Sequence, residues 1–196
     1  MRTPNPKQFD KDVSNHVMTI VNDNGVNRCI QFADPKTFNL HFTLTTWPGY
    51  LCISGDMGTY VFARLKDMFE FFRSAKGETN PDYWAEKCEA ADKRTGGATD
   101  CYDKDIFRER VKERVDDYFT DKKQRARCWQ EIEDTVLHAD SEYEAHDNAR
   151  KFEFEGFQLT DFWECNLRRD TYQYLWCCLA IVWGIHQYDA AKAVTV

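Results

Sequence analysis

Residues 40–63 read LHFTLTTWPGYLCISGDMGTYVFA, a pattern that predicts consecutive β-strands joined by short turns. Runs of β-branched and aromatic residues are separated by two turn signals, Trp47-Pro48-Gly49 and Gly55-Asp56-Met57-Gly58. Glycine and aspartate tolerate the backbone conformations that such turns require. Because the connections are too short for crossover helices, we expect the strands to pair antiparallel.

The same pattern continues toward the N-terminus, where Asp23-Asn24-Gly25 and Asp34-Pro35 are further turn signals. We therefore predict an N-terminal antiparallel sheet of about four or five strands. The predicted strands are Val17–Val21, Arg28–Ala33, Leu40–Thr46, Tyr50–Ile53 and Tyr60–Ala63.

From Leu65 onward the apolar spacing becomes helical. Phe152–Leu159 alternates apolar and polar residues and is predicted as a strand or extended segment. Because the sheet precedes the helices, the predicted class is α+β, in a single domain over 1–196. The glycine-rich stretch Thr95–Thr99 places any subdomain boundary near 95–100. The predicted helices are Leu65–Phe72, with a glycine cap near Lys76-Gly77, then Asn80–Cys88, Asp103–Phe119 and Lys122–Ala139.

The last predicted helix, Thr171–Tyr188, is apolar on all sides and contains no Asp, Glu, Lys or Arg. Asp170 is predicted as its N-cap. Its length is at the lower limit for a bilayer span, and polar residues such as Gln173 and His186 interrupt it. We expect a buried hydrophobic helix and no membrane contact, with a homodimer contact as the alternative.

The overall charge favours a protein partner over nucleic acid. Lys and Arg total 26 against 33 Asp and Glu, a net charge of -7. Such a chain repels phosphate backbones, so we expect no direct nucleic-acid binding. The first twelve residues lack the apolar core of a secretory signal, so a cytoplasmic location is expected. The eight cysteines form no CxxC pair and are expected to be reduced core residues.

One stretch, between Cys128 and Ala149, is acidic and contains no Lys or Arg. It is either a solvated helix face and loop, or a negative surface that imitates nucleic-acid phosphates and occupies a basic surface of a partner. Trp47 is a further partner-binding candidate because tryptophan at a hairpin tip often anchors an interface, although it could instead fold back on its own sheet. The acidic candidates are Glu131, Glu133, Asp134, Asp140, Glu142, Glu144 and Asp147.

Motifs for nucleophilic catalysis, nucleotide binding and zinc proteolysis are absent from the sequence. Asp56 resembles a metal-binding acid of a nuclease, but the usual acidic and lysine partners on the next strand are missing, so a turn role is favoured. Glu142 and His146 lie four apart, with His138 and Asp140 just upstream, as a metal site would need. His41 and Cys52 are the remaining catalytic pair considered. We predict no enzyme activity, no catalytic or metal site and no cofactor, with a metal-dependent nuclease or hydrolase as the alternative.

Several segments together resemble a group of small hypothetical proteins encoded by tailed phages and prophages. The resemblance covers about Asn39 to Asp189 and carries no functional residue. It implies a setting inside a host bacterium, where small acidic phage proteins such as anti-CRISPR proteins and DNA mimics disable host machinery. The segments are Phe42–Gly49, Ser54–Phe62, Asp67–Arg73, Phe152–Phe162, Tyr174–Cys178 and Trp183–Ile185.

The function expected from these observations is inhibition of a host defence or nucleic-acid-handling complex, such as a CRISPR effector. The expected partner is a host protein or ribonucleoprotein with a basic nucleic-acid-binding surface, which the chain would block by steric or charge mimicry. A structural or regulatory phage protein that forms a homodimer is the third alternative.

Overall fold

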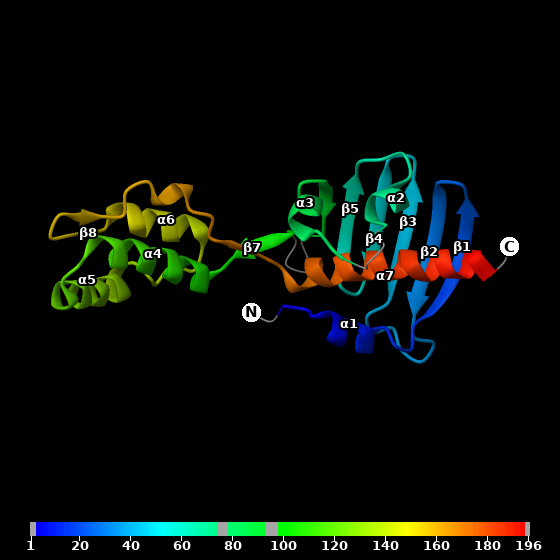
Figure 1. Cartoon of the computed structure of the whole chain (residues 1–196), viewed down its shortest axis with the longest axis horizontal. Coiled ribbons are helices and arrows are strands. Elements are labelled where there is room, and N and C mark those ends of the chain that lie inside the picture. Colours follow the sequence, from blue (N-terminus) through cyan, green and yellow to red (C-terminus); the bar gives the residue numbers. More distant parts are fainter. Residues whose placement is uncertain (1–2, 74–77, 93–97, 195–196) are drawn as a thin grey trace. The chain divides into compact units, whose positions relative to one another are not determined.

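The computed structural model describes residues 3–73, 78–92 and 98–194, and its internal contacts divide the chain into two compact units. Unit 1 comprises Met1–Thr99 and Asp170–Val196, and unit 2 comprises Asp100–Arg169. The predicted α+β class is confirmed (Figure 1). The sequence predicts that any subdomain boundary lies near 95–100. Residues 95–97 of this stretch lie outside the described residues, and along the chain unit 1 ends at Thr99 and unit 2 begins at Asp100.

Unit 1 is built on a six-stranded antiparallel sheet in which each strand pairs with the next one along the chain. The hairpin β3–β4 turns tightly at Pro48-Gly49, where Gly49 has a φ of 89°, a left-handed conformation that favours glycine. The strands are β1 (Val17–Asn24), β2 (Asn27–Ala33), β3 (Phe42–Trp47), β4 (Tyr50–Gly55), β5 (Gly58–Ala63) and β6 (Cys88–Ala91).

Two details of the predicted sheet are wrong. Strand β3 begins at Phe42 because Leu40 has a φ of 60°, and its N–H donates to the Asp56 carboxylate at 2.9 Å instead of joining the ladder. Cys88 was expected at the end of a helix that opens at Asn80, but the helix α3 (Pro81–Ala85) is shorter. Cys88–Ala91 instead pairs with the edge of β5 and supplies the sixth strand.

The helix α7 (Tyr172–Val194) lies across one face of the sheet and forms its second layer (Figure 1). Alternate residues of the strands point toward this helix, as expected for a sheet with one covered face. The inward side chains of the four middle strands that are fully or almost fully buried are Ile30, Phe32, Phe42, Leu44, Leu51, Ile53, Tyr60 and Phe62. They pack with Trp176, Ile181 and Ile185 of α7 into one hydrophobic core.

Gly184 allows α7 to approach the sheet closely. A Cβ atom added there would lie 2.9 Å from Cδ1 of Leu44 and 3.1 Å from Cε2 of Phe32. Glycine in a helix interior is unfavourable for the helix itself. Its presence here is therefore explained by the packing distance between α7 and strands β2 and β3.

The N-terminus of α7 differs from the prediction. Asp170 is the last residue of strand β10 (Arg168–Asp170), and the backbone N–H of Tyr174 donates to Oγ1 of Thr171 at 3.2 Å. Thr171 is therefore the N-cap, one residue later than predicted. Within residues 3–73, 78–92 and 98–194, no helix has the length and apolar content needed to cross a bilayer.

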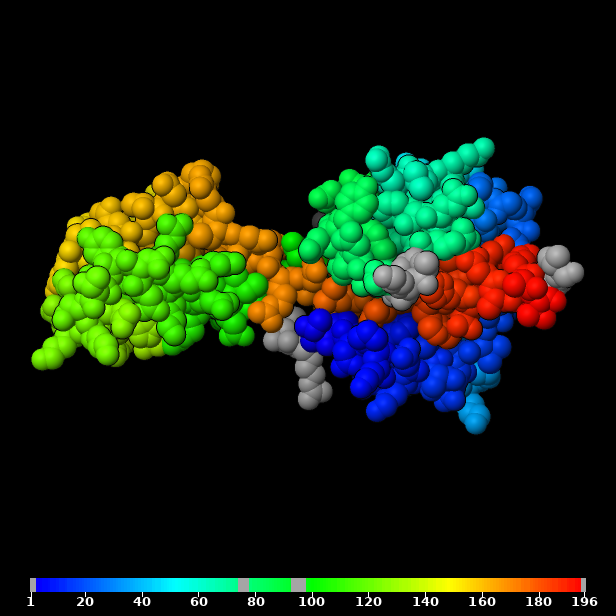
Figure 2. All heavy atoms as spheres, viewed as in Figure 1, coloured from blue at the N-terminus to red at the C-terminus, as the bar shows by residue number. Residues whose placement is uncertain are grey.

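Three short helices pack around α7 on the same core. Phe9 of α1 (Pro6–Asp12) contacts the Trp176 ring edge-on, with ring centroids 5.2 Å apart. The helix α2 (Met68–Phe72) begins three residues later than predicted, because Asp67 adopts an extended conformation and caps the helix. The C-terminal cap predicted at Lys76-Gly77 lies outside the described residues. Figure 2 shows α7 between the N-terminal segment on one side and the α2–α3 region on the other.

A buried ion pair joins the sheet to α2. The guanidinium of Arg28 on β2 donates two hydrogen bonds, of 2.9 and 2.8 Å, to the Asp67 carboxylate. Arg28 also lies 4.6 Å from the centroid of the Phe69 ring. Its side chain is 9% exposed, so the charge is almost entirely removed from water. The hydrogen bonds from Arg28 lower the pKa of the Asp67 carboxyl.

Unit 2 is mainly helical. Phe107, Val111 and Val115 of α4 (Lys104–Tyr118) pack with Cys128 and Ile132 of α5 (Lys122–Thr135) in a second hydrophobic core. The N-caps Asp103, Asp121 and Ser141 each accept backbone hydrogen bonds. Unit 2 also contains α6 (Glu142–Lys151), the 3-10 helix η2 (Phe162–Glu164), and strand β7 (Asp100–Tyr102), which pairs with β10.

Two predicted boundaries in unit 2 are wrong. Helix α5 ends at Thr135 instead of Ala139, and the carbonyl of Val136 accepts a hydrogen bond from the Asn148 side chain. Residues 152–159 form a hairpin of β8 (Glu153–Phe154) and β9 (Phe157–Gln158), not one strand. Glu155 and Gly156 both have positive φ, as a two-residue hairpin turn of the primed type requires.

The cysteines form no disulfide, and all eight lie among the described residues. Cys128, Cys177 and Cys178 are buried, as expected of core residues. The other five are half-buried, so the prediction that the thiols act as core hydrophobes is confirmed for three of the eight.

Candidate functional site

Unit 2 carries almost all of the net charge of the chain. Residues 100–169 contain 19 acidic and 13 basic residues, a net charge of -6 out of -7 for the chain. The remaining residues, which make up unit 1, are close to neutral. An electrostatic interaction with a partner would therefore involve unit 2.

Four of the seven predicted acids have a cationic partner, and for three of them the partner is distant in the sequence. Glu133 pairs with Arg108 of α4, and Asp140 pairs with Lys104 at the start of α4. Glu142 accepts a hydrogen bond of 2.6 Å from Arg168, which also binds Asp100 at 2.9 Å. These cations are contributed by segments that precede or follow the acidic stretch. Much of its charge is thus compensated within unit 2.

Asp147 is the fourth acid with a cationic partner. One carboxylate oxygen accepts a hydrogen bond from Arg150 at 2.7 Å, and the other pairs with Lys151 in the last turn of α6. The two cations, Lys151 foremost, lower the pKa of Asp147. Lys104 has the same effect on the pKa of Asp140. Both carboxyl groups are charged at neutral pH and are held within the unit.

The other three acids have no ion pair with a described residue. The side chain of Glu144 accepts the N–H of Asp140 at 2.8 Å, while its own N–H donates to Ser141, so Glu144 helps to cap α6. Glu131 and Asp134 are exposed and lie three residues apart on α5, which places them on one helix face. Asp134 accepts only a hydrogen bond from the neighbouring Gln130 side chain. Glu131 and Asp134 are therefore the predicted acids best placed to contact another molecule.

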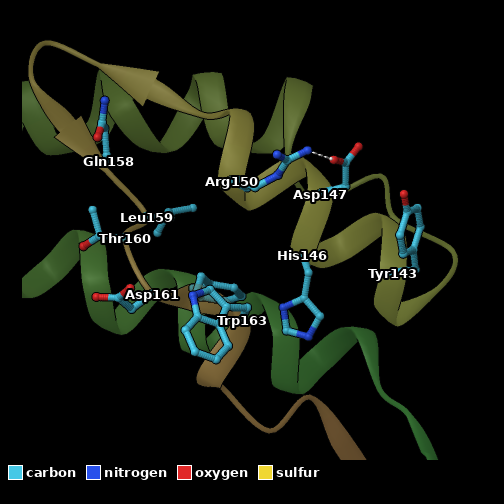
Figure 3. A pocket seen from close by; sticks show the side chains of 10 residues that line it. Tyr143, His146, Asp147, Arg150, Gln158, Leu159, Thr160, Asp161 and Trp163 are labelled. Carbon is cyan, nitrogen blue, oxygen red and sulfur yellow. Dashed lines mark hydrogen bonds and ion pairs between the residues drawn. The ribbon is translucent and has the colours of Figure 1, made fainter.

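A pocket of about 530 Å³ lies between α6 and residues 158–163 (Figure 3). Two large aromatic side chains on it are mostly exposed: Tyr143, at 80%, and Trp163, at 68%. The buried Nδ1 of His146 has no hydrogen-bond partner among the described residues. The lining residues are Tyr143, His146, Asp147, Arg150, Gln158, Leu159, Thr160, Asp161, Phe162 and Trp163.

The backbone around η2 explains why Trp163 is on the surface. Asp161 has a φ of 53°, a left-handed conformation that aspartate tolerates better than most residues. The following residue, Phe162, is buried against Phe107 and the His146 ring. Because Phe162 points into the core, its neighbour Trp163 points outward beside the pocket (Figure 3).

Sequence reasoning missed this pocket. Trp163 lies in no periodic pattern, and Tyr143 belongs to a helix of only ten residues. The available signal was the sequence Asp161-Phe162-Trp163-Glu164, where two large aromatics stand between acids in a segment with no helical or strand period.

The predicted anchor Trp47 belongs to unit 1, whereas the predicted acids belong to unit 2. It stacks on Tyr50, its partner across the β3–β4 hairpin, with ring centroids 5.3 Å apart and an interplanar angle of 15°. Trp47 is 38% exposed, so it partly covers its own sheet and partly faces solvent.

The residues considered for catalysis have local structural roles. Asp56 accepts the N–H of Leu40 and donates its own N–H to the carbonyl of His41, as a turn residue does. The ring of His41 bonds the carbonyl of Phe38, and burial raises the pKa of the Cys52 thiol, which makes it a poorer nucleophile. Over the described part of the chain, no group of three or more His, Cys, Asp or Glu side chains is arranged to hold a metal ion, including the region around Glu142 and His146.

Comparison of the chain with protein families, with curated proteins and with solved structures finds no match in any of the three. A functional assignment therefore depends on the charge and geometry of the chain itself.

Proposed function

We propose that this chain is a binding protein that uses unit 2 to occupy a basic, nucleic-acid-binding surface of a partner protein and thereby inhibits it. The observation that carries the proposal is the concentration of net negative charge in unit 2. Charge complementarity accelerates encounter and selects partners of opposite sign.

The ion pairs within unit 2 reduce the number of acidic residues that are free to contact a partner. A carboxylate that already holds a cation gains less from a second one, because the first compensates its charge. Glu131 and Asp134 have no such cation, and they are assigned the leading electrostatic role. Glu133, Asp140, Glu142 and Asp147 are assigned mainly to the stability of unit 2.

The narrower form of the proposal identifies the partner as part of a host defence complex, such as a CRISPR effector, and the chain as phage-encoded. That form depends on the resemblance described from the sequence. The homodimer alternative assumed that the apolar last helix needs a second subunit to cover it. It is less favoured, because α7 buries its large apolar side chains against the sheet of its own unit.

The test compares the unaltered chain with two variants of equal charge change. The first carries Glu131→Lys and Asp134→Lys on α5. The matched control carries Asp10→Lys and Glu89→Lys at exposed positions of unit 1. Each tagged protein is incubated with lysate of a bacterium that has active defence systems, and the retained proteins are identified by mass spectrometry.

The expected result is a nucleic-acid-binding protein that the unaltered chain and the control retain, that the α5 variant loses, and that added duplex DNA or RNA releases. The proposal is refuted if no retained protein depends on Glu131 and Asp134, or if the retained proteins do not compete with nucleic acid. Circular dichroism of both variants checks that each chain remains folded.

A further inference from the structure

We propose that the pocket between α6 and residues 158–163 binds a planar cation, the guanidinium of an arginine side chain. This inference deepens the proposed function and depends on it only for the source of the arginine, which a basic partner surface would present.

The exposed indole of Trp163 is the first feature that favours a planar cation. An aromatic side chain of this size that remains 68% exposed beside a concavity provides a flat platform for a ligand. Tryptophan has the most favourable ring face for a cation, and a guanidinium can also stack on it in parallel. Tyr143 offers a second exposed ring on the same pocket (Figure 3).

The lining also carries an unpaired negative charge. Asp161 is exposed, and its carboxylate has no ion pair or hydrogen bond with another described residue. Asp161 lines the same pocket as Trp163, and the fork of N–H groups of a guanidinium matches carboxylate geometry. The net charge of -6 on the surrounding unit also attracts a cation.

The pocket contains one cation of its own, Arg150, which would repel a second one if it were free. Its guanidinium donates to Asp147 at 2.7 Å (Figure 3), and because Asp147 also pairs with Lys151, the charge of Arg150 is only partly compensated. An anionic ligand would have to compete with Asp147 for Arg150. A cationic ligand finds in Asp161 a carboxylate without a partner among the described residues, and this difference favours a cationic ligand.

The remaining wall of the pocket carries hydrogen-bond acceptors. Thr160 and Gln158 add side-chain oxygens to the lining. These oxygens accept hydrogen bonds, and a guanidinium has five N–H donors and no acceptor.

The experiment uses the full chain and three short peptides of glycine and serine with one central residue: arginine, citrulline or lysine. Citrulline has nearly the shape of arginine without its charge, and lysine has the charge without the plane. Binding is followed by the chemical shifts of the Trp side-chain N–H groups, with Trp163→Phe used to assign the indole signal of residue 163.

We expect saturable binding of the arginine peptide, with both other peptides about tenfold weaker or more. Trp163→Ala should abolish binding because it removes the platform. Asp161→Asn should weaken it severalfold while preserving the left-handed backbone, which asparagine also tolerates. Phe38→Ala, at an exposed aromatic of unit 1, is the matched control and should leave binding unchanged.

Equal binding of the citrulline peptide, or binding that survives Trp163→Ala, would overturn the inference. So would the absence of any saturable shift with the arginine peptide. The two proposals fail separately. If the arginine peptide does not bind while partner capture still depends on Glu131 and Asp134, the pocket assignment is wrong and the inhibitor function stands. If the peptide binds but partner capture does not depend on Glu131 and Asp134, the pocket assignment stands and the proposed inhibitor function is wrong.

Discussion

Replacing Asp67 with alanine should destabilise unit 1 more than any other single change to its charged residues. Asp67 has two roles, since it neutralises the buried Arg28 and caps helix α2 through the N–H of Phe69. The variant leaves a guanidinium that is only 9% exposed without its counter-ion. The exposed pair Arg73–Asp189 in the same unit, with side chains 41% and 36% exposed, serves as the control.

The magnitude follows from burial. Removing one partner of a buried ion pair costs about 3–5 kcal/mol, and the partial exposure of Asp67, at 21%, places this pair near the lower value. Loss of the N-cap adds about 1 kcal/mol. We expect a total of about 4 kcal/mol for Asp67→Ala, against less than about 1 kcal/mol for Asp189→Ala, because exposed ion pairs contribute little.

The assay is urea unfolding monitored by tryptophan fluorescence. Trp129 and Trp163 of unit 2 are replaced by phenylalanine in every variant, so that the fluorescence comes from the tryptophans of unit 1 alone. A double variant, Arg28→Met with Asp67→Asn, should recover most of the loss because no charge is left unpaired and asparagine still caps α2. If Asp67→Ala and Asp189→Ala have the same effect within about 1 kcal/mol, the buried pair does not carry the stability assigned to it here.

Three further outcomes are expected. Gly184→Ala should destabilise unit 1 by about 1–2 kcal/mol, because overpacking against Leu44 outweighs the gain in helix propensity, and a more stable variant in urea unfolding would contradict the packing argument. The pKa values of Asp23 and Asp67 are lowered, chiefly by hydrogen bonds from Lys192 and Arg28 respectively. Their contribution to the stability of unit 1 is therefore complete above the unfolded pKa of about 4, and it is lost as the pH falls through the folded pKa values. Asp23→Asn should therefore flatten the loss of stability measured below pH about 4, and an unchanged pH profile would exclude Asp23 as a contributor. Replacing Asp100–Arg169 with Asn-Gly should leave unit 1 with a cooperative unfolding transition, because its two segments are hydrogen-bonded to each other next to the deleted residues. Loss of the near-ultraviolet circular dichroism signal in the shortened protein would show that unit 1 depends on unit 2.

The sheet was predictable because its signals are local. Alternating strands and glycine turns lie within a few residues of each other, and all five predicted strands are present. The sixth strand was not predictable, because the sequence around Cys88 continues a helical pattern and only the free edge of β5 makes it a strand. Leu40 is a similar case, since its left-handed conformation is set by a hydrogen bond to Asp56, sixteen residues away.

The acidic residues of the candidate site could be listed from the sequence, but their electrostatic environment could not. The stretch from Cys128 to Ala149 contains no cation, yet Lys104, Arg108 and Arg168 reach it from elsewhere in the chain. The pocket was beyond prediction for the same reason, because α6 and residues 158–163 become neighbours only through the hairpin β8–β9 between them.

The order of elements in unit 1 has a consequence for biosynthesis. During translation the ribosome delivers the sheet first, then the whole of unit 2, and only afterwards α7, which covers the sheet. Unit 2 has its own hydrophobic core and can fold while it emerges. In that interval the inner face of the sheet, with Phe32, Leu44 and Ile53, has no second layer and is exposed to other nascent chains and to chaperones. The yield of this protein in a cell is therefore expected to depend on how long the nascent sheet waits for α7.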